Sequence, residues 1–297
     1  MKRNTISRTV CIGLGGWSKL VLKALQENAP WLVLREFDRD RSHADYFSDI
    51  EFPEMPEFSR VAYEMLNKDP NFKIFFDKLQ DDPGFCQEPK LGFIWSVDNY
   101  LWLKDIVSEQ VLELQSPNVI REIEKNGKAM AAPTSVFVLT GSGGGTGPGL
   151  TIPVLAALRE IERSGFQLIV YVISLTPDAY KNIAPLQRYN AHQISAELFG
   201  FLEEHGKEQN SKTHVFRYVD HSRYGEPMAE IKLTFLYNNL YIIPSHELNQ
   251  VEAALNAAHF INCYSHKATS IRAVEANFGQ SQNNIIFNDL LSKGGER

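Results

Sequence analysis

Short apolar runs alternate with longer amphipathic stretches along the chain. Five runs have the length and character of buried strands: residues 9–12, 31–34, 135–140, 167–173 and 239–244. Four other stretches carry the periodicity of amphipathic helices: residues 18–28, 150–164, 185–205 and 247–276. Strands that alternate with helices in this way are typical of a parallel sheet covered on both faces. The pattern therefore predicts an α/β fold, a three-layer, Rossmann-like, mostly parallel sheet flanked by helices.

Residues 42–115 interrupt this alternation. The segment contains five prolines and many aromatic residues. Its periodicity predicts short helices at residues 58–67 and 72–79 and a longer one at residues 97–114. We interpret the segment as an elaboration on the sheet, and its aromatic residues as part of the core.

Composition and charge argue against several functional classes. The chain has 297 residues, with 30 Lys and Arg against 36 Asp and Glu, and a net charge of −6. Because there is no basic tract, binding to nucleic acid is disfavoured. No apolar run approaches the roughly 20 residues of a membrane span, and the residues after Lys2 and Arg3 are polar, so neither a span nor a secretory signal is expected. Cys11, Cys86 and Cys263 lack zinc or disulfide spacing, which favours a reducing, cytoplasmic compartment.

The strongest chemical signal is a glycine-rich loop at residues 141–149, in which six of the nine residues are glycine. It follows a predicted buried strand and precedes a predicted helix. Glycines let backbone N–H groups approach an anion closely, and the start of a helix adds unpaired N–H groups and a positive dipole end. Thr146 adds a hydroxyl group. The loop therefore predicts a site for a diphosphate or triphosphate.

Two standard phosphate motifs do not fit. The Walker motif needs Gly-Lys-Ser/Thr at the helix start, and this loop has no lysine. The dinucleotide fingerprint Gly-x-Gly-x-x-Gly is only partly present, because Gly13 and Gly15 are followed by Ser18. What remains is a pair of glycine loops at the carboxyl ends of two predicted strands, which in an open α/β sheet form one crevice. Tight turns without a ligand are the alternative interpretation.

The second loop carries a family resemblance. Residues 143–149, Gly-Gly-Gly-Thr-Gly-Pro-Gly, resemble the tubulin/FtsZ signature, with Pro148 in its sixth place. Four other segments resemble family elements in the family's order: residues 12–16 the first nucleotide loop, residues 174–177 the Thr-x-Pro loop beside the ribose, residues 239–244 the strand before the central helix, and residues 284–289 the last loop. The resemblance implies the tubulin/FtsZ nucleotide-binding domain.

The resemblance also implies a function. Members of the family bind GTP or GDP, with Mg²⁺ held through the phosphates, and assemble head to tail, so the implied partner is a second copy in longitudinal self-association. The last loop of one subunit positions water on the GTP of the next, and hydrolysis is phosphoryl transfer governed by positioning and charge. The implied enzyme is a GTPase that is weak or depends on assembly. Other protein partners are not indicated.

The implied site residues follow from matching this sequence to the family pattern. The nucleotide-binding residues are Gly13, Gly15, Gly16, Asp38, Gly143, Gly144, Gly145, Thr146, Gly147, Thr176, Pro177, Arg188 and Asn256. Asn284 and Asp289 are the implied catalytic residues of the last loop. Two assignments keep an alternative. Asp38, for ribose or metal, could instead cap a strand end, and Asn256, for the guanine edge, could instead be a polar residue on a helix surface.

The sequence departs from the family pattern in the last loop. Ile286 stands where the family has its first acidic residue, and an isoleucine cannot polarise water or bind a cation. This departure keeps a second hypothesis open, a GTP- or GDP-binding regulatory or scaffold module that does not polymerise. A dinucleotide-dependent enzyme is disfavoured, because that fold places its fingerprint after the first strand.

The expected domain organisation follows the same resemblance. Residues 1–246 are expected to form the GTP-binding domain, with the insertion at about residues 42–115. Residues 247–297 are expected to hold the central helix and the start of the last loop. Only eight residues follow Asp289, so the second domain of the family is expected to be absent, either lost or left out of a fragment.

Overall fold

The computed structural model describes the chain in ranges separated by gaps. The described residues are 4–29, 32–40, 50–68, 70, 84–114, 117–125, 128–175, 177–180, 185–205, 213–223, 228–233, 236–243, 250–267 and 286–288. Within them no helix is long and apolar enough to cross a membrane.

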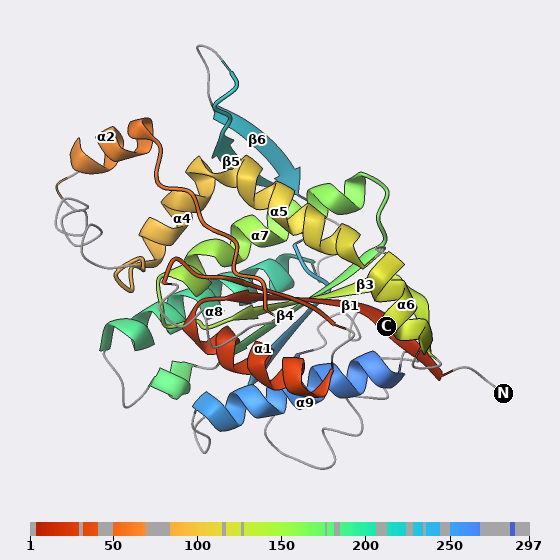
Figure 1. The fold of residues 1–297 in the computed structure, drawn as a ribbon. Helices are drawn as coiled ribbons and strands as arrows, with labels where there is room; N and C mark the ends of the chain where they lie inside the picture. Colours follow the sequence, from red (N-terminus) through yellow and green to blue (C-terminus); the bar gives the residue numbers. More distant parts are fainter. Residues whose placement is uncertain are drawn as a thin grey trace, which may run out of the picture.

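A mixed sheet forms the centre of the molecule (Figure 1). Its strands are β1 (Asn4–Leu14), β2 (Val33–Phe37), β3 (Lys128–Thr140), β4 (Leu168–Leu175), β7 (Asn239–Ile243) and β8 (Ile286–Asn288). Their order is β2-β1-β3-β4-β7-β8, and the first five run parallel while β8 is antiparallel to β7. The predicted parallel α/β sheet is confirmed.

Helices cover both faces of the sheet. The helices are α1 (Gly16–Asn28), α2 (Arg60–Lys68), α4 (Pro89–Asp98), α5 (Tyr100–Glu113), α6 (Pro117–Lys125), α7 (Thr146–Arg163), α8 (Pro185–His205), α9 (Gln250–Lys267) and the short 3₁₀ helix η2 (Pro177–Tyr180). Helices α1 and α9 pack together on one face, and α7 lies with α4 and α5 on the other (Figure 1). Side chains of β1 alternate between the faces: Val10 and Ile12 join the α7 core, and Cys11 the α1 and α9 core.

Several element boundaries differ from the sequence prediction. The second strand covers residues 33–37, not 31–34, because its carboxyl half carries charged residues that an apolar pattern does not mark. The predicted helix at 97–114 is two helices, since the backbone of Asn99 leaves the helical region between α4 and α5. Two predicted helical segments, 72–79 and the end of the last helix at 268–276, lie outside the described residues.

Several aromatic residues of the predicted insertion are core residues, whereas Phe93 is exposed. Trp95 and Tyr100, at the end of α4 and the start of α5, are fully buried against α7 and the hairpin. The hairpin consists of β5 (His214–Val219) and β6 (Met228–Leu233), which pair antiparallel. The centre of the Tyr218 ring, in β5, lies 4.6 Å from the centre of the Tyr100 ring. The hairpin therefore packs on the helices of the insertion.

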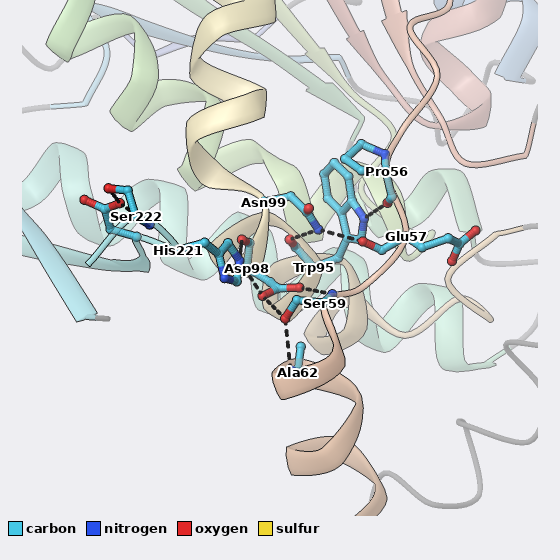
Figure 2. Close-up of polar contacts among 10 residues, drawn as sticks. Pro56, Glu57, Ser59, Ala62, Trp95, Asp98, Asn99, His221 and Ser222 are labelled. Atoms are coloured by element: carbon cyan, nitrogen blue, oxygen red, sulfur yellow. Dashed lines mark hydrogen bonds and ion pairs between the residues drawn. The ribbon is translucent and has the colours of Figure 1, made fainter. Parts of the chain in front are cut away.

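One buried carboxylate joins three of these segments (Figure 2). Asp98, at the end of α4, accepts hydrogen bonds from the Ser59 backbone N–H and hydroxyl at 2.6 and 2.7 Å. His221, in the turn after β5, lies with its Nε2 3.2 Å from the same carboxylate. Asp98 thus fixes the start of α2 and the hairpin to the α4–α5 junction. These contacts are structural, and they lie about 13 Å along α4 from Pro89, at the end of the helix that meets the second glycine loop.

Candidate functional site

Both glycine loops emerge at the point where the order of the sheet reverses. Strand β1 has β2 on one side and β3 on the other, so the connections that follow β1 and β3 turn to opposite faces. In open α/β sheets, ligands bind in the crevice outside the carboxyl ends of the strands at such a switch point. The first loop leaves β1 at Leu14, and the Gly141 N–H of the second donates to the Leu14 carbonyl at 3.4 Å. The structure therefore brings the two predicted loops together.

Three of the six glycines in the second loop are required by close packing. A Cβ added at Gly147 would lie 2.4 Å from the Gly141 carbonyl oxygen. One added at Gly149 would lie 2.7 Å from the Gly92 Cα, and one at Gly145 would lie 2.8 Å from the Phe85 Cβ. These distances are too short for any side chain, so these positions close the loop against β1, α4 and its preceding turn.

Two other glycines face open space. A Cβ added at Gly16 or at Gly144 would meet nothing within 4 Å. Gly16 begins α1 and Gly144 lies just before α7, so each belongs to a loop that opens a helix. In the first loop Gly15 has φ +82°, a conformation that favours glycine, and it approaches the backbone of Gly147. Backbone that is uncovered at two helix starts is the arrangement that receives an anion.

A third segment, not identified from the sequence, borders the second loop. Residues 85–88 form a turn before α4, in which Cys86 and Gln87 both have positive φ, at 52° and 58°. Asn190, buried on α8, donates through its side-chain amide to the Gln87 carbonyl at 2.8 Å and to the Gly143 carbonyl at 3.3 Å. The only sequence signal was Glu88 followed by Pro89, an acidic N-cap before a proline. Asn190 thus ties this turn and the glycine loop to α8.

A buried charged group connects the first loop to the second. Asp38, which follows β2, accepts a hydrogen bond from the Thr146 hydroxyl at 3.0 Å. Its other oxygen lies 2.8 Å from Nζ of Lys19 in the first turns of α1, and both side chains are less than a tenth exposed. Lys19 also donates to the Asp40 carbonyl at 2.9 Å. Asp38 and Thr146 are predicted site residues, whereas no pattern in the sequence indicates Lys19.

A second buried carboxyl group, that of Glu36, lies beside the first loop. Ser18 Oγ lies 2.9 and 3.0 Å from the two carboxyl oxygens of Glu36, and 2.5 Å from the Gly15 carbonyl oxygen. Burial, and then the nearby Asp38 carboxylate, raise the pKa of Glu36 well above its usual range. One hydroxyl proton cannot serve three acceptors, whereas a protonated Glu36 can donate to Ser18 Oγ. A neutral Glu36 is therefore consistent with both its burial and its contacts.

The remaining predicted residues lie around or outside these loops. Pro177 begins η2 after β4, whose Leu175 carbonyl accepts a hydrogen bond from the Ser142 hydroxyl at 3.2 Å, so this strand end borders the second loop. Arg188 is exposed on α8, two residues before Asn190. Asn256 is half-buried on α9, whose first residue accepts a hydrogen bond from the Trp17 indole at 3.1 Å. Thr176, Asn284 and Asp289 lie outside the described residues.

The amino-acid sequence was compared with models of protein families and with curated protein sequences. The family described as "Tubulin like" matches residues 86–291, more than half of the chain. A search of curated protein sequences finds no match.

Solved structures share the fold. CetZ2 from Haloferax volcanii, in a GTPγS-bound protofilament, is 14% identical with a TM-score of 0.50, over 91% of this chain and 62% of CetZ2. TubZ from Bacillus thuringiensis serovar israelensis, in a GTPγS-form protofilament, is 13% identical with a TM-score of 0.45, over 89% of this chain and 57% of TubZ. The chain therefore spans less than two thirds of the length of either protein.

Proposed function

The chain belongs to the tubulin-like protein family, and from this premise we propose that it binds a guanine nucleotide between its two glycine loops and assembles head to tail when the nucleotide is bound. The observation that carries the proposal is the pair of open positions, Gly16 and Gly144, on two loops that meet at the switch point of the sheet. The CetZ2 structure, a GTPγS-bound protofilament, supports both parts of it.

The residues present fit a nucleotide diphosphate or triphosphate. A side chain at Gly16 or Gly144 would enter the space beside two helix starts, which indicates that this space is kept for a ligand. We propose that the backbone of residues 13–16 and 143–147 holds the phosphates, and that Mg²⁺ is held through those phosphates. Thr176 and Pro177 are proposed for the ribose side, Arg188 for contact with a phosphate, and Asn256 for the guanine edge.

Hydrolysis is proposed as a property of the assembled form. Asn284 and Asp289 would position water on the nucleotide of the adjacent subunit, and Ile286 lacks the carboxylate that would do so directly. Turnover is therefore expected to be slow and to rise with protein concentration, because the site is completed by a second copy.

Three readouts taken together test this proposal. Purified protein is mixed with fluorescent GTP to measure binding, and with GTP and Mg²⁺ to follow light scattering and phosphate release; ATP at the same concentration is the control. We expect saturable binding that prefers GTP, scattering that appears above a critical concentration, and phosphate release that follows the scattering. Equal binding of ATP and GTP would contradict the assignment of guanine, and no binding at all would contradict the site.

A second candidate function is a guanine-nucleotide-binding module that does not polymerise. The observation that favours it is the position of Ile286, which lies in β8 and pairs with Ile242 at the edge of the sheet. A segment paired in this way, without its acidic residue, is poorly suited to complete a neighbour's site. Tight GTP binding with neither scattering nor phosphate release at high protein concentration would establish this candidate over the first.

A further inference from the structure

A buried ion pair between Lys19 and Asp38 lies beside the first glycine loop, and the proposed nucleotide site does not by itself require such a pair. Lys19 and Asp38 have side chains that are 7% and 8% exposed and lie 2.8 Å apart. Burying an ammonium group is costly unless it is paired, and replacing such a pair with apolar residues is often neutral or stabilising. Fold stability alone therefore gives no strong reason for a lysine here.

The carboxylate of Asp38 is occupied on both oxygens. One oxygen lies against Nζ of Lys19, and the other accepts hydrogen bonds from the Thr146 hydroxyl at 3.0 Å and the Asp40 N–H at 3.2 Å. The positive charge beside Asp38 is therefore supplied by Lys19 of the protein itself. Asp38 is then a positioning residue, which acts through Lys19 and Thr146.

The ammonium group of Lys19 keeps capacity for a further acceptor. An ammonium has three N–H donors, and among the described residues two are accounted for by Asp38 and the Asp40 carbonyl, while Nζ also lies 6.0 Å from the centre of the Phe52 ring. Through Asp38 it is tied to Thr146, the first residue of α7 at the end of the second glycine loop. The third N–H donor of Lys19 is therefore part of an ammonium group that is held in a fixed position beside both loops.

We propose that Lys19 is a built-in cation of the nucleotide site, held by Asp38, which neutralises phosphate charge and makes nucleotide binding largely independent of Mg²⁺. This inference rests on the proposed guanine-nucleotide function. Lysine binds phosphate as a point charge. Its contribution is expected to grow with the number of phosphates, since guanosine monophosphate, diphosphate and triphosphate carry increasing negative charge.

The test compares nucleotide affinity with Mg²⁺ and with EDTA. Because Lys19→Met alone leaves Asp38 buried and unpaired, and this variant could fail to fold, the main variant is Lys19→Met with Asp38→Asn, which removes both charges at once. Lys23→Met is the matched control, since Lys23 is an exposed lysine one turn later on α1. Thermal unfolding without nucleotide confirms that each variant is folded.

For the wild type we expect EDTA to change the dissociation constant for GTP by less than about threefold. In the double variant we expect a loss of about tenfold in EDTA, the size of one charge-assisted hydrogen bond, larger for GTP than for the monophosphate and partly restored by Mg²⁺. The Lys23→Met control should behave as the wild type.

Three results would overturn the inference while leaving the nucleotide site intact, and the first two concern binding in EDTA. One is wild-type binding that collapses in EDTA, and the other is a folded double variant that matches the wild type in EDTA for all three nucleotides. A loss that is equal for all three nucleotides would also contradict it, because a merely structural role of Lys19 predicts no dependence on phosphate number. If the wild type binds no guanine nucleotide under either condition, the proposed function fails, and this inference fails with it.

Discussion

The two glycine loops leave adjacent strands at the same edge of the sheet, yet they are built differently. The second loop is made almost entirely of backbone: Gly145, Gly147 and Gly149 pack against neighbouring main chain and leave Gly144 open. The first loop is short and is surrounded by ionisable side chains from β2, from the residue that follows it and from α1, namely Glu36, Asp38 and Lys19. One loop supplies shape and the other supplies charge.

This difference shows what a signature motif can and cannot report. The second loop is recognisable because each closed position excludes every residue but glycine, so its sequence is fixed by steric contact. The charges of the first loop are brought together by tertiary contacts, and many arrangements of residues could produce them. The predictions below test the two loops separately, from the largest expected effect to the smallest.

Filling the open position of the second loop should abolish binding without unfolding the protein. For Gly144→Val we expect nucleotide affinity to fall by about 100-fold or more, or about 2.7 kcal/mol, because the side chain occupies the space proposed for phosphate. Gly200→Val is the matched control, since Gly200 also faces open space but lies about 15 Å along α8 from Asn190. Titration with fluorescent GTP measures both; unchanged affinity in Gly144→Val would remove the phosphate site from this loop.

A substitution at a closely packed glycine should instead lower the stability of the fold. For Gly147→Ala we expect a loss of about 1–3 kcal/mol in the free energy of unfolding, because the new methyl group meets the Gly141 and Leu14 carbonyls. Urea unfolding measures this loss. A variant as stable as the wild type would mean that the two loops do not pack as described.

The amide of Asn190 should matter for the shape of the second loop. In Asn190→Ala the Gln87 and Gly143 carbonyls lose their donor, so we expect nucleotide affinity to fall by about tenfold, as for one or two hydrogen bonds. Gln193→Ala, an exposed position on the same helix, is the control. If both variants bind alike, the contact does not order the loop.

The smallest expected effect concerns Glu36, the buried carboxyl group beside the first loop. Because the pKa of Glu36 is raised in the folded state, the folded protein keeps this proton over a pH range in which the unfolded chain has lost it. Stability should therefore fall as pH rises through this range, and Glu36→Gln should remove that part of the slope. We expect Glu36→Gln to gain stability relative to the wild type at pH 8 and to lose this advantage toward pH 4.

Urea unfolding of the two proteins at a series of pH values checks this prediction. Parallel curves for the wild type and Glu36→Gln across the whole series would mean that folding does not raise the pKa of Glu36.

The sequence was sufficient for the architecture and for the second loop. Apolar runs located five strands of the sheet because parallel strands are buried on both faces and carry continuous apolar residues. The segment around Asn99 was read as one helix, since the break there depends on capping and on contacts with distant segments. The predicted position of strand β2 differs from the observed one because Arg35 and Glu36 are buried through partners that no local pattern reveals.

The missed parts of the site share a physical cause. The turn at residues 85–88 is held by Asn190, more than a hundred positions later. Lys19 is placed by Asp38, which lies 19 positions later, and Asp38 by Thr146, which lies 108 positions later. Polar contacts over such distances in the chain depend on the assembled fold, and no spacing rule in a single sequence records them.

Amide hydrogen exchange with and without GTP tests the central claim most directly, because it reports on both loops in one experiment. If the two loops hold the phosphates together, exchange should slow in residues 13–16 and in residues 143–147 when GTP is added, and the hairpin of β5 and β6 should be unaffected. Slowing that is confined to other parts of the chain, or that appears in only one of the two loops, would contradict the account.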